Sequence, residues 1–311
     1  MWKFHKKEQD NNQYIVDNTY KLIKYVDKKV IAFNITVIVL AIITLCVAIY
    51  YIIDTKIRID KNKEFEAQIE EYINQQEEIA KQKEMERQAK IPKLTEEGKQ
   101  NVKQIYKSDI KRVFLTFDDG PSTNTSTILD ILKQNNIKAT FFVLGTQVQK
   151  FPELTKRMYD EGHSIANHGY SHKYSQIYQT PQEVLNEYNQ CNQIVANTIG
   201  VPEYNSHLFR FPGGSVGGKY AQIKTEAIQI LDQNGVVYVD WNAVTGDSET
   251  SNPTEEYLMN NLQQTTKEKN SVVLLMHDSQ AKKISVDTLP KIIEYLKQQG
   301  YEFQNFYNII K

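Results

Sequence analysis

Short apolar runs alternate with amphipathic stretches along residues 111–305 of this chain. The runs predict strands at 113–117, 139–144, 164–167, 208–211, 236–239 and 272–276. The stretches between them predict helices near 125–135, 147–161, 181–199, 218–234, 253–268 and 285–299. Glycines stand where several of these helices should end, namely Gly162, Gly200, Gly235 and Gly300. Repeated strand–helix units predict an α/β fold, a mainly parallel sheet covered by helices and either open or closed into a barrel.

Residues 30–53 form a long apolar run without a charged residue, enough to cross the ~30 Å of a bilayer core. Lysines are frequent before it, and Lys28 and Lys29 lie directly beside it. The positive-inside tendency then predicts a cytoplasmic tail at 1–29, a transmembrane helix at 30–53 and an extracytoplasmic remainder. The alternative is a cleaved signal peptide, but such apolar cores are shorter and end at small residues. We therefore expect a single-pass protein of the cell membrane.

Residues 54–90 are rich in Glu, Lys and Gln and contain neither Gly nor Pro, which predicts a helix. Its apolar residues form an irregular stripe: Phe65, Ile69, Tyr72, Ile73 and Ile79. Because the heptads are broken, the pattern favours a solvated helical stalk; a coiled-coil homodimer is the alternative. Pro92 ends this segment, and 91–110 is predicted to be a short helix or linker. The expected organisation is thus tail, span, a stalk and linker at 54–110, and a catalytic domain at 111–305.

Composition excludes two classes of protein. With 37 basic and 38 acidic residues the net charge is −1, so nothing indicates binding to nucleic acid. Cys46 and Cys191 are the only cysteines, and Cys46 lies in the apolar run, which argues against a disulfide framework.

Five polar clusters lie at or just beyond the ends of the predicted strands. They are Thr116–Gly120, His168–His172, Arg210–Gly214, Asp240–Asp247 and Leu274–Asp278. In barrels of parallel strands the carboxyl ends of the strands carry the active site, so these clusters are expected to meet.

Asp118 and Asp119 point in different directions at a strand end, so one carboxylate can bind a metal while the other faces substrate. The alternative is a simple Asp-Gly turn. On a helical turn, the spacing of His168 and His172 would bring both imidazoles to one face. One Asp and two His would leave coordination positions open, the pattern of a catalytic zinc site. His163, which precedes a strand, is predicted to be structural.

Arg210 can hold a nearby carboxylate ionised, because its guanidinium does not lose its proton. His277 follows a strand that is predicted to be buried on both faces, where it can protonate a leaving group. Asp240 or Asp247 could hold that imidazole as an imidazolium.

Residues 111–305 resemble the polysaccharide deacetylases of carbohydrate esterase family 4. Thr116–Gly120 is similar to the first family motif, which implies that Asp118 is the base and Asp119 a metal ligand. His168 and His172 match the two metal-binding histidines of the second motif. In the third, Arg210-x-Pro212-x-Gly214, the resemblance implies that Arg210 tunes the base and that the backbone N–H of Gly213 serves the oxyanion.

Leu275-x-His277 is similar to the fifth motif, with His277 as the acid and Leu275 lining the pocket for the acetyl methyl group. The fourth motif is ambiguous. Asp240-Trp241 has the familiar spelling, but Asp247 lies in the loop that usually carries the tuning carboxylate. We favour Asp247 and expect Trp241 to supply an aromatic wall.

The resemblance implies a distorted (β/α) barrel with fewer than eight full units. Two positions depart from the family pattern: Gly169 replaces a usual Ser or Thr, and Gly213 replaces a residue that is commonly aromatic or bulky. The sugar is therefore expected to contact a different wall.

The predicted function is metal-dependent removal of N-acetyl groups from a cell-wall glycan, most of all N-acetylglucosamine in peptidoglycan. The cation is expected to be zinc, or another divalent ion such as Co²⁺ or Mn²⁺. Alternatives within the same chemistry are poly-N-acetylglucosamine, chitin oligomers or an O-acetylated polymer. An inactive domain that binds wall glycan is the competing class. A glycosidase is a third hypothesis, but adjacent carboxylates lack the facing geometry such enzymes need.

Overall fold

The computed structural model describes residues 59–89 and 91–310. The chain divides into two units, the first ending at Lys81 and the second beginning at Gln82. The predicted tail at 1–29 and membrane span at 30–53 lie outside the described residues. Within the described part of the chain, no helix is both long and apolar enough to cross a bilayer.

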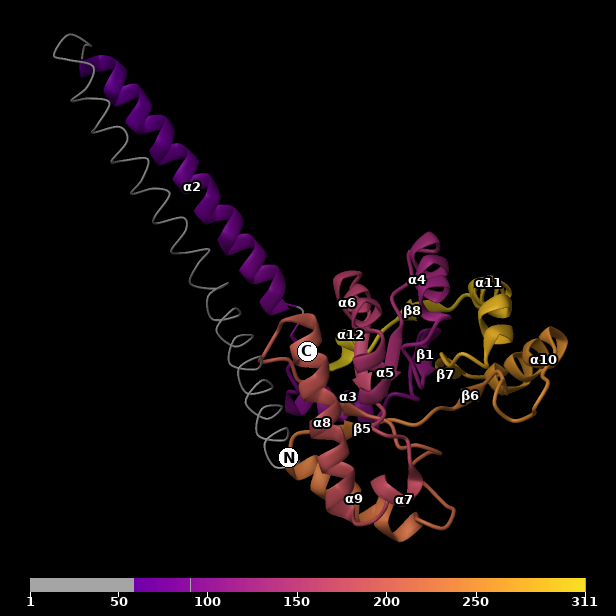
Figure 1. Cartoon of the computed structure of the whole chain (residues 1–311). Coiled ribbons are helices and arrows are strands. Elements are labelled where there is room, and N and C mark those ends of the chain that lie inside the picture. Colours follow the sequence, from indigo (N-terminus) through magenta and orange to yellow (C-terminus); the bar gives the residue numbers. More distant parts are fainter. Residues whose placement is uncertain (1–58, 90, 311) are drawn as a thin grey trace, which may run out of the picture. The chain divides into compact units, whose positions relative to one another are not determined.

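Helix α2, Ile59–Ala89, occupies the segment in which the sequence predicts a helical stalk (Figure 1). Tyr72 and Ile79 are exposed on it. Homodimer formation through this helix stays a prediction.

The unit that begins at Gln82 contains a sheet whose paired strands all run parallel. Its strands are β1 Arg112–Asp118, β2 Thr140–Val143, β3 Ser164–Asn167, β4 Leu208–Phe209, β5 Val237–Tyr238, β6 Ala243–Val244, β7 Ser271–His277 and β8 Glu302–Gln304. Their order is β5-β4-β3-β2-β1-β7-β6, and β8 pairs with β1 outside this path. The predicted parallel α/β sheet is therefore confirmed.

The sheet curls toward a barrel because its two end strands are neighbours in sequence. Only residues 239–242 separate β5 from β6, and an extended chain rises at most ~3.6 Å per residue. The opposite edges of the sheet are thus held close together. Val239 N–H donates to Phe209 O in β4, and Asn242 N–H donates to Val273 O in β7, so this short link is bonded to the strand next to each edge.

Helices cover the outside of the sheet in an order that follows the strands. The covering helices are α4 Thr125–Gln134, α6 Pro152–Asp160, α8 Pro181–Ile199, α9 Ala221–Gln233, α10 Glu255–Thr266 and α11 Lys283–Gln298. Neighbours contact each other in the sequence α9, α8, α6, α4, α11, α10 (Figure 1). Helix α8 shows how the sequence sets the limits: Thr180 caps its first turn, Pro181 begins it, and Gly200 ends it at φ 74°.

Side chains of β1 alternate between the two faces of the sheet. Val113, Leu115 and Phe117 pack under the covering helices, whereas Phe114 joins a separate inner cluster with Phe142, Val273 and Phe306. Asp118 has the same parity as Phe114 and Thr116, so its carboxylate faces the interior of the curled sheet. On this inner face the strand thus carries a charged group at its carboxyl end, beyond a cluster of apolar side chains.

The apolar core also includes residues that precede the expected boundary at residue 111. Helix α3, Glu96–Lys103, belongs to the sheet-bearing unit, since Val102 and Ile105 are buried in the inner cluster. The short helix α12, Tyr307–Ile310, adds Ile309 and Ile310 to the same cluster. Residues on both sides of 111–305 thus contribute to the inner cluster.

Several predicted elements are shorter or divided. The helix expected at 147–161 is two helices, α5 Gly145–Lys150 and α6, because Pro152 holds the preceding Phe151 in a non-helical conformation (φ −131°, ψ 59°). The strand expected at 208–211 ends at Phe209, so Arg210 lies just past it. Strands β6 and β8 and the short helix α7, Tyr174–Ile177, were not predicted.

Candidate active site

The strand register gathers the predicted clusters at the carboxyl edge of the sheet. Asp118 pairs with Phe142 on one side and with His277 on the other. Asn167 at the end of β3 pairs with Phe209, directly before Arg210. The side chains that follow these strand ends therefore converge on one place.

Three of them form a cluster suited to a cation. One ligand atom from each of Asp119, His168 and His172 lies within 4.8 Å of the others. Asp119 Oδ1 is 3.4 Å from His172 Nε2 and 3.7 Å from His168 Nε2. The same oxygen is buried without a hydrogen-bond partner among the described residues. A buried carboxylate oxygen left in this way is costly unless a cation meets it, so the residues fit a bound divalent metal.

The protonation of His168 agrees with metal binding. Its Nδ1 lies 2.7 Å from the backbone oxygen of Arg210, which places the ring proton there and leaves the Nε2 lone pair toward Asp119. Burial lowers the pKa of His168 to about 3, so the imidazole is neutral. Neutral imidazole is the form that binds zinc.

The histidine pair lies in a loop and not on the helical turn that the spacing predicted. Gly169 has φ 90° and His172 has φ 58°, so the chain reverses between the two ligands. A residue that the sequence reasoning missed, Glu187, holds this loop from helix α8. Its Oε2 accepts the N–H groups of Tyr170 at 2.6 Å and Ser171 at 2.7 Å, and its Oε1 accepts the Ser171 hydroxyl at 2.6 Å.

The absence of a side chain at Gly169 has a steric reason. A Cβ there would lie 3.0 Å from Ile177 Cδ1 and 3.2 Å from Glu187 Oε2, and φ is in the left-handed region.

The sequence did contain a signal for Glu187, because this carboxylate stands among apolar residues that form the buried face of α8.

Asp119 is turned toward the histidines by a left-handed backbone, φ 72°, directly after the end of β1. Asp278, the last residue of the fifth cluster, was given no role by the sequence reasoning, and it holds the following loop. It is fully buried and accepts hydrogen bonds from Ser122 Oγ at 2.8 Å and Thr125 Oγ1 at 2.5 Å. Its backbone N–H donates to Asp118 O at 2.7 Å. Burial raises the pKa of Asp278 to about 7.

Asp118 faces the other side of the turn and pairs with Arg210. The guanidinium Nη1 donates to Asp118 Oδ1 at 2.9 Å and to Thr116 Oγ1 at 2.7 Å. Its other nitrogens donate to the backbone oxygens of Val239 and Asp240, and it stacks over the Phe142 ring at 3.9 Å. Arg210 is completely buried and therefore rigid.

The sequence predicted that Arg210 would lower the pKa of its carboxylate partner. In the folded protein, burial raises the pKa of Asp118, while Arg210 and His277 pull it down without overcoming burial. A carboxylate with a raised pKa is a stronger base than an exposed one.

His277 is bound by Asp247 and not by Asp240. Its Nδ1 lies 2.8 Å from Asp247 Oδ1, and its backbone N–H donates to Oδ2 of the same carboxylate at 2.8 Å. Ser285 Oγ also donates to that carboxylate, at 2.6 Å. Burial lowers the pKa of His277. The hydrogen bond and the charge of Asp247 raise it by more than burial lowers it, so the pKa is about 9. Asp240 instead accepts from the backbone and hydroxyl of Ser215.

The loop after Arg210 brings its backbone to the rim of the site. Gly213 and Gly214 have φ values of 74° and 79°. The Trp241 ring lies against Gly214, and the Arg210 guanidinium is 5.8 Å from the same ring. Leu275 is buried in β7, two residues before His277. Trp241 thus lies beside Arg210, and its role as an aromatic wall stays a prediction.

Two histidines lie elsewhere. His163 is fully buried, accepts the Ala139 N–H at 3.1 Å and packs edge-on against Phe141. His207 Nδ1 lies 2.8 Å from Gly235 O. Each is explained by its local packing, as predicted for His163.

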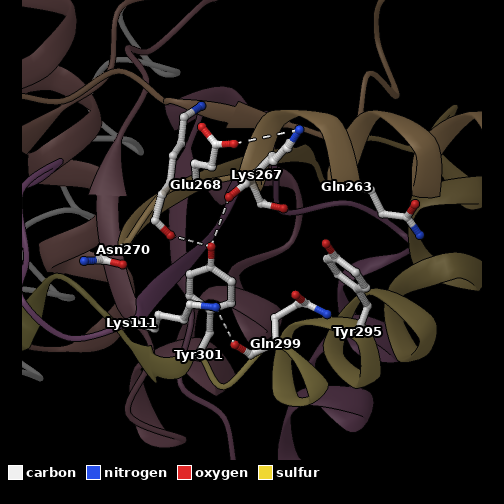
Figure 2. A pocket seen from close by; sticks show the side chains of 10 residues that line it. Lys111, Gln263, Lys267, Glu268, Asn270, Tyr295, Gln299 and Tyr301 are labelled. Carbon is white, nitrogen blue, oxygen red and sulfur yellow. Dashed lines mark hydrogen bonds and ion pairs between the residues drawn. The ribbon is translucent and has the colours of Figure 1, made fainter.

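A hollow at the opposite edge of the sheet, near the amino ends of β1, β7 and β8, has no comparable chemistry (Figure 2). Lys111 Nζ donates to Gln299 O at 2.9 Å, and Lys269 Nζ donates to Thr265 O at 2.6 Å. The Tyr301 hydroxyl donates to Lys269 O at 2.6 Å. These contacts tie loops together through backbone oxygens, so the hollow is a structural junction.

Comparison with known proteins agrees with the site. The polysaccharide deacetylase family profile matches residues 105–239. The chain is 36% identical over 198 residues to the putative polysaccharide deacetylase YheN of Bacillus subtilis, which covers 62% of this chain and 66% of that protein. It is 33% identical over 203 residues to a peptidoglycan-N-acetylglucosamine deacetylase of Bacillus cereus, with 63% and 70% covered. A Streptococcus mutans CE4 esterase structure superposes with a TM-score of 0.61 at 33% identity, over 67% of this chain and 90% of that one. The chain therefore belongs to the polysaccharide deacetylases of carbohydrate esterase family 4, enzymes that hydrolyse the acetyl amide bonds of polysaccharides.

Proposed function

We propose that this protein removes acetyl groups from N-acetylglucosamine residues of peptidoglycan in a reaction that depends on a divalent cation, zinc in the first place. The observation that carries the proposal is the convergence of three groups at one sheet edge. They are the Asp119–His168–His172 cluster, the Asp118–Arg210 pair and the Asp247–His277 pair. Peptidoglycan is favoured because several relatives are named as deacetylases of its N-acetylglucosamine.

In this proposal Asp119, His168 and His172 hold the cation. When bound, the cation would polarise the acetamide carbonyl and make water more acidic. Asp118 removes a proton from the attacking water as the new C–O bond forms at the carbonyl carbon. Arg210 holds the Asp118 carboxylate in place through its short hydrogen bond to Oδ1.

The charge that develops on the carbonyl oxygen meets the backbone N–H of Gly213, a fixed donor that needs no reorganisation. His277 then delivers a proton to the sugar nitrogen as the C–N bond breaks, leaving acetate and a free amine. Asp247 occupies His277 Nδ1, so Nε2 is the nitrogen available to the leaving group. Leu275 and Trp241 line the space for the acetyl group and the sugar.

The full chain, purified in detergent and loaded with zinc, should release acetate from purified peptidoglycan. Release should stop when the metal is chelated and return when zinc is restored. Activity on soluble N-acetylglucosamine oligomers alone would keep the chemistry and change the polymer. A zinc-loaded protein that binds glycan but releases no acetate from either would favour a binding scaffold over an enzyme.

We also propose that residues 30–53 anchor the protein in the cell membrane with the catalytic domain outside. The support is the uncharged apolar run and the lysines that precede it. Protease added to intact protoplasts should remove the catalytic domain and leave the tail at 1–29 protected. Recovery of the domain in the culture medium, with a new N-terminus near residue 53, would contradict an uncleaved anchor.

A further inference from the structure

Tyr174 occupies the space in which a side chain at position 213 would begin. A Cβ built on Gly213 would lie 2.5 Å from Tyr174 Oη, 3.2 Å from Cζ and 3.4 Å from Cε2. The first of these distances is impossible for non-bonded atoms, so the hydroxyl end of Tyr174 fills that volume. The missing side chain of one loop is replaced by a tyrosine from another.

Several aromatic rings hold Tyr174 in this position. Its ring centroid is 5.6 Å from the ring of His172 and 5.6 Å from that of Tyr178, which it meets nearly edge-on at 77°. Tyr178 is fully buried, and its hydroxyl donates to Pro212 O at 2.7 Å. Tyr174 is therefore fixed between the loop that carries His172 and the loop that carries Gly213.

The exposed part of Tyr174 has the properties of a ligand contact. The residue keeps 40% of its surface exposed although its ring is packed on more than one side. Within the described part of the chain, its hydroxyl has no hydrogen-bond partner. Tyrosine offers a rigid apolar face and a polar tip, and such side chains at the rim of a pocket fix the orientation of a ligand.

We propose that Tyr174 contacts the sugar whose acetyl group is removed and so determines the preference for N-acetylated sugars over small acetyl compounds. Its ring packs against the C–H face of the pyranose, and its hydroxyl hydrogen-bonds to a sugar oxygen. This inference rests on the proposed function, since it places the same sugar between His172 and Gly213. It assigns Tyr174 to substrate binding and gives it no role in holding the metal.

The test compares two substrates in the zinc-loaded full chain: the N-acetylglucosamine tetramer and 4-nitrophenyl acetate, which carries an acetyl group but no sugar. Tyr174→Phe should raise KM for the tetramer several-fold, and Tyr174→Ala should raise it at least about tenfold. Both variants should keep kcat/KM for 4-nitrophenyl acetate within about twofold of the parent. Zinc bound per chain should not change.

Tyr220→Phe is the matched control, because Tyr220 belongs to the same aromatic group, with its ring 6.4 Å from that of Tyr174. It should leave both substrates unaffected. Equal losses on both substrates in the Tyr174 variants would show that Tyr174 supports the metal site and would overturn the inference. An unchanged KM for the tetramer would overturn it too.

The outcome remains decisive if the parent protein releases no acetate. Calorimetric titration of the parent and of Tyr174→Ala with the tetramer then measures sugar binding directly. Weaker binding by the variant would support Tyr174 as the sugar contact while the proposed hydrolysis fails. Equal binding, or none by the parent, would refute the role of Tyr174.

Discussion

Asp118 and His277 are direct partners in the register of two adjacent parallel strands, β1 and β7. Parallel strands lie ~4.8 Å apart, and paired residues project to the same face. The proposed base and acid therefore stand side by side on the inner face of the sheet. Asp247 holds His277 from one flank and Arg210 holds Asp118 from the other.

The pH profile should depend on Asp247. Because the pKa of His277 is raised to about 9, the imidazole is protonated at neutral pH and activity should fall only as pH rises through about 9. Asp247→Asn removes the largest interactions that raise the pKa of His277. Burial, which lowers the pKa, remains, as do the weaker raising effects of the Asp118 and Asp119 charges. The alkaline limb of kcat/KM should therefore move from about 9 to a clearly lower pH.

The measurement is acetate release from the oligomer between pH 5 and 10. Asp240→Asn serves as the control, because Asp240 is bonded to Ser215 and not to His277. An alkaline limb that stays in place in Asp247→Asn would refute the assignment of His277 as the acid.

Neighbouring carboxylates should have separable roles. Asp118→Asn removes the base and should lower kcat by ~10²–10⁴-fold while zinc binding is kept. Asp119→Asn removes a ligand and should lower zinc affinity instead, with activity recovering in part at high zinc concentration. Metal analysis of dialysed protein, together with kcat at saturating zinc, distinguishes the two. Loss of zinc from Asp118→Asn would contradict the assignment of Asp118 as the base and Asp119 as the metal ligand.

Asp118→Asn should also destabilise the fold. Arg210 is completely buried, and removing the charge of Asp118 leaves that guanidinium without its ionic partner. We expect a lower thermal midpoint than that of Asp119→Asn, whose side chain lies closer to solvent.

Glu187 is expected to control metal affinity without touching the metal. It accepts three hydrogen bonds from Tyr170 and Ser171, between the two histidine ligands. Glu187→Gln replaces an acceptor-only carboxylate with a group that must also donate, so the loop should loosen. Zinc affinity should fall by ~10–100-fold, as for other residues that orient metal ligands.

The control is Glu183→Gln, one turn earlier on α8, where the carboxylate accepts a hydrogen bond from Asn186 on the same helix. Zinc affinity is measured by competition with a chromogenic chelator. If Glu187→Gln binds zinc as tightly as the control, Glu187 has a packing role only.

The sequence predicts the parts of this site that depend on local pattern. Strand ends follow from buried apolar runs, which is why Asp118, Asp119 and His277 are placed correctly at the edge of the sheet. Helix limits at Thr180 and Gly200 follow from cap residues. These signals lie within a few residues of the element they define.

What could not be predicted depends on contacts between distant segments. The family resemblance favours Asp247 over Asp240, but the contact itself depends on the pairing of β6 with β7, which brings Asp247 to His277. The pKa of Asp118 follows from burial, which the sequence does not reveal. The conformation of the 168–172 loop depends on Glu187, a residue from the next long helix.

The steric relation between Gly213 and Tyr174 gives the last prediction. Gly213→Ala should destabilise the fold for two reasons. Its φ of 74° is left-handed, and its Cβ would collide with Tyr174 Oη. Gly217→Ala has nearly the same φ, 72°, with nothing within 4 Å of the new Cβ, so it isolates the cost of a left-handed backbone, roughly 1–2 kcal/mol. Gly213→Ala should lower the thermal midpoint more than Gly217→Ala does. In a Tyr174→Ala background the collision is absent. Gly213→Ala and Gly217→Ala should then lower the free energy of unfolding by the same amount. The difference from the parent background corresponds to a coupling energy of roughly 0.5–3 kcal/mol between positions 174 and 213. Additive effects in this double-mutant cycle would mean that Tyr174 does not occupy the space above Gly213 in solution.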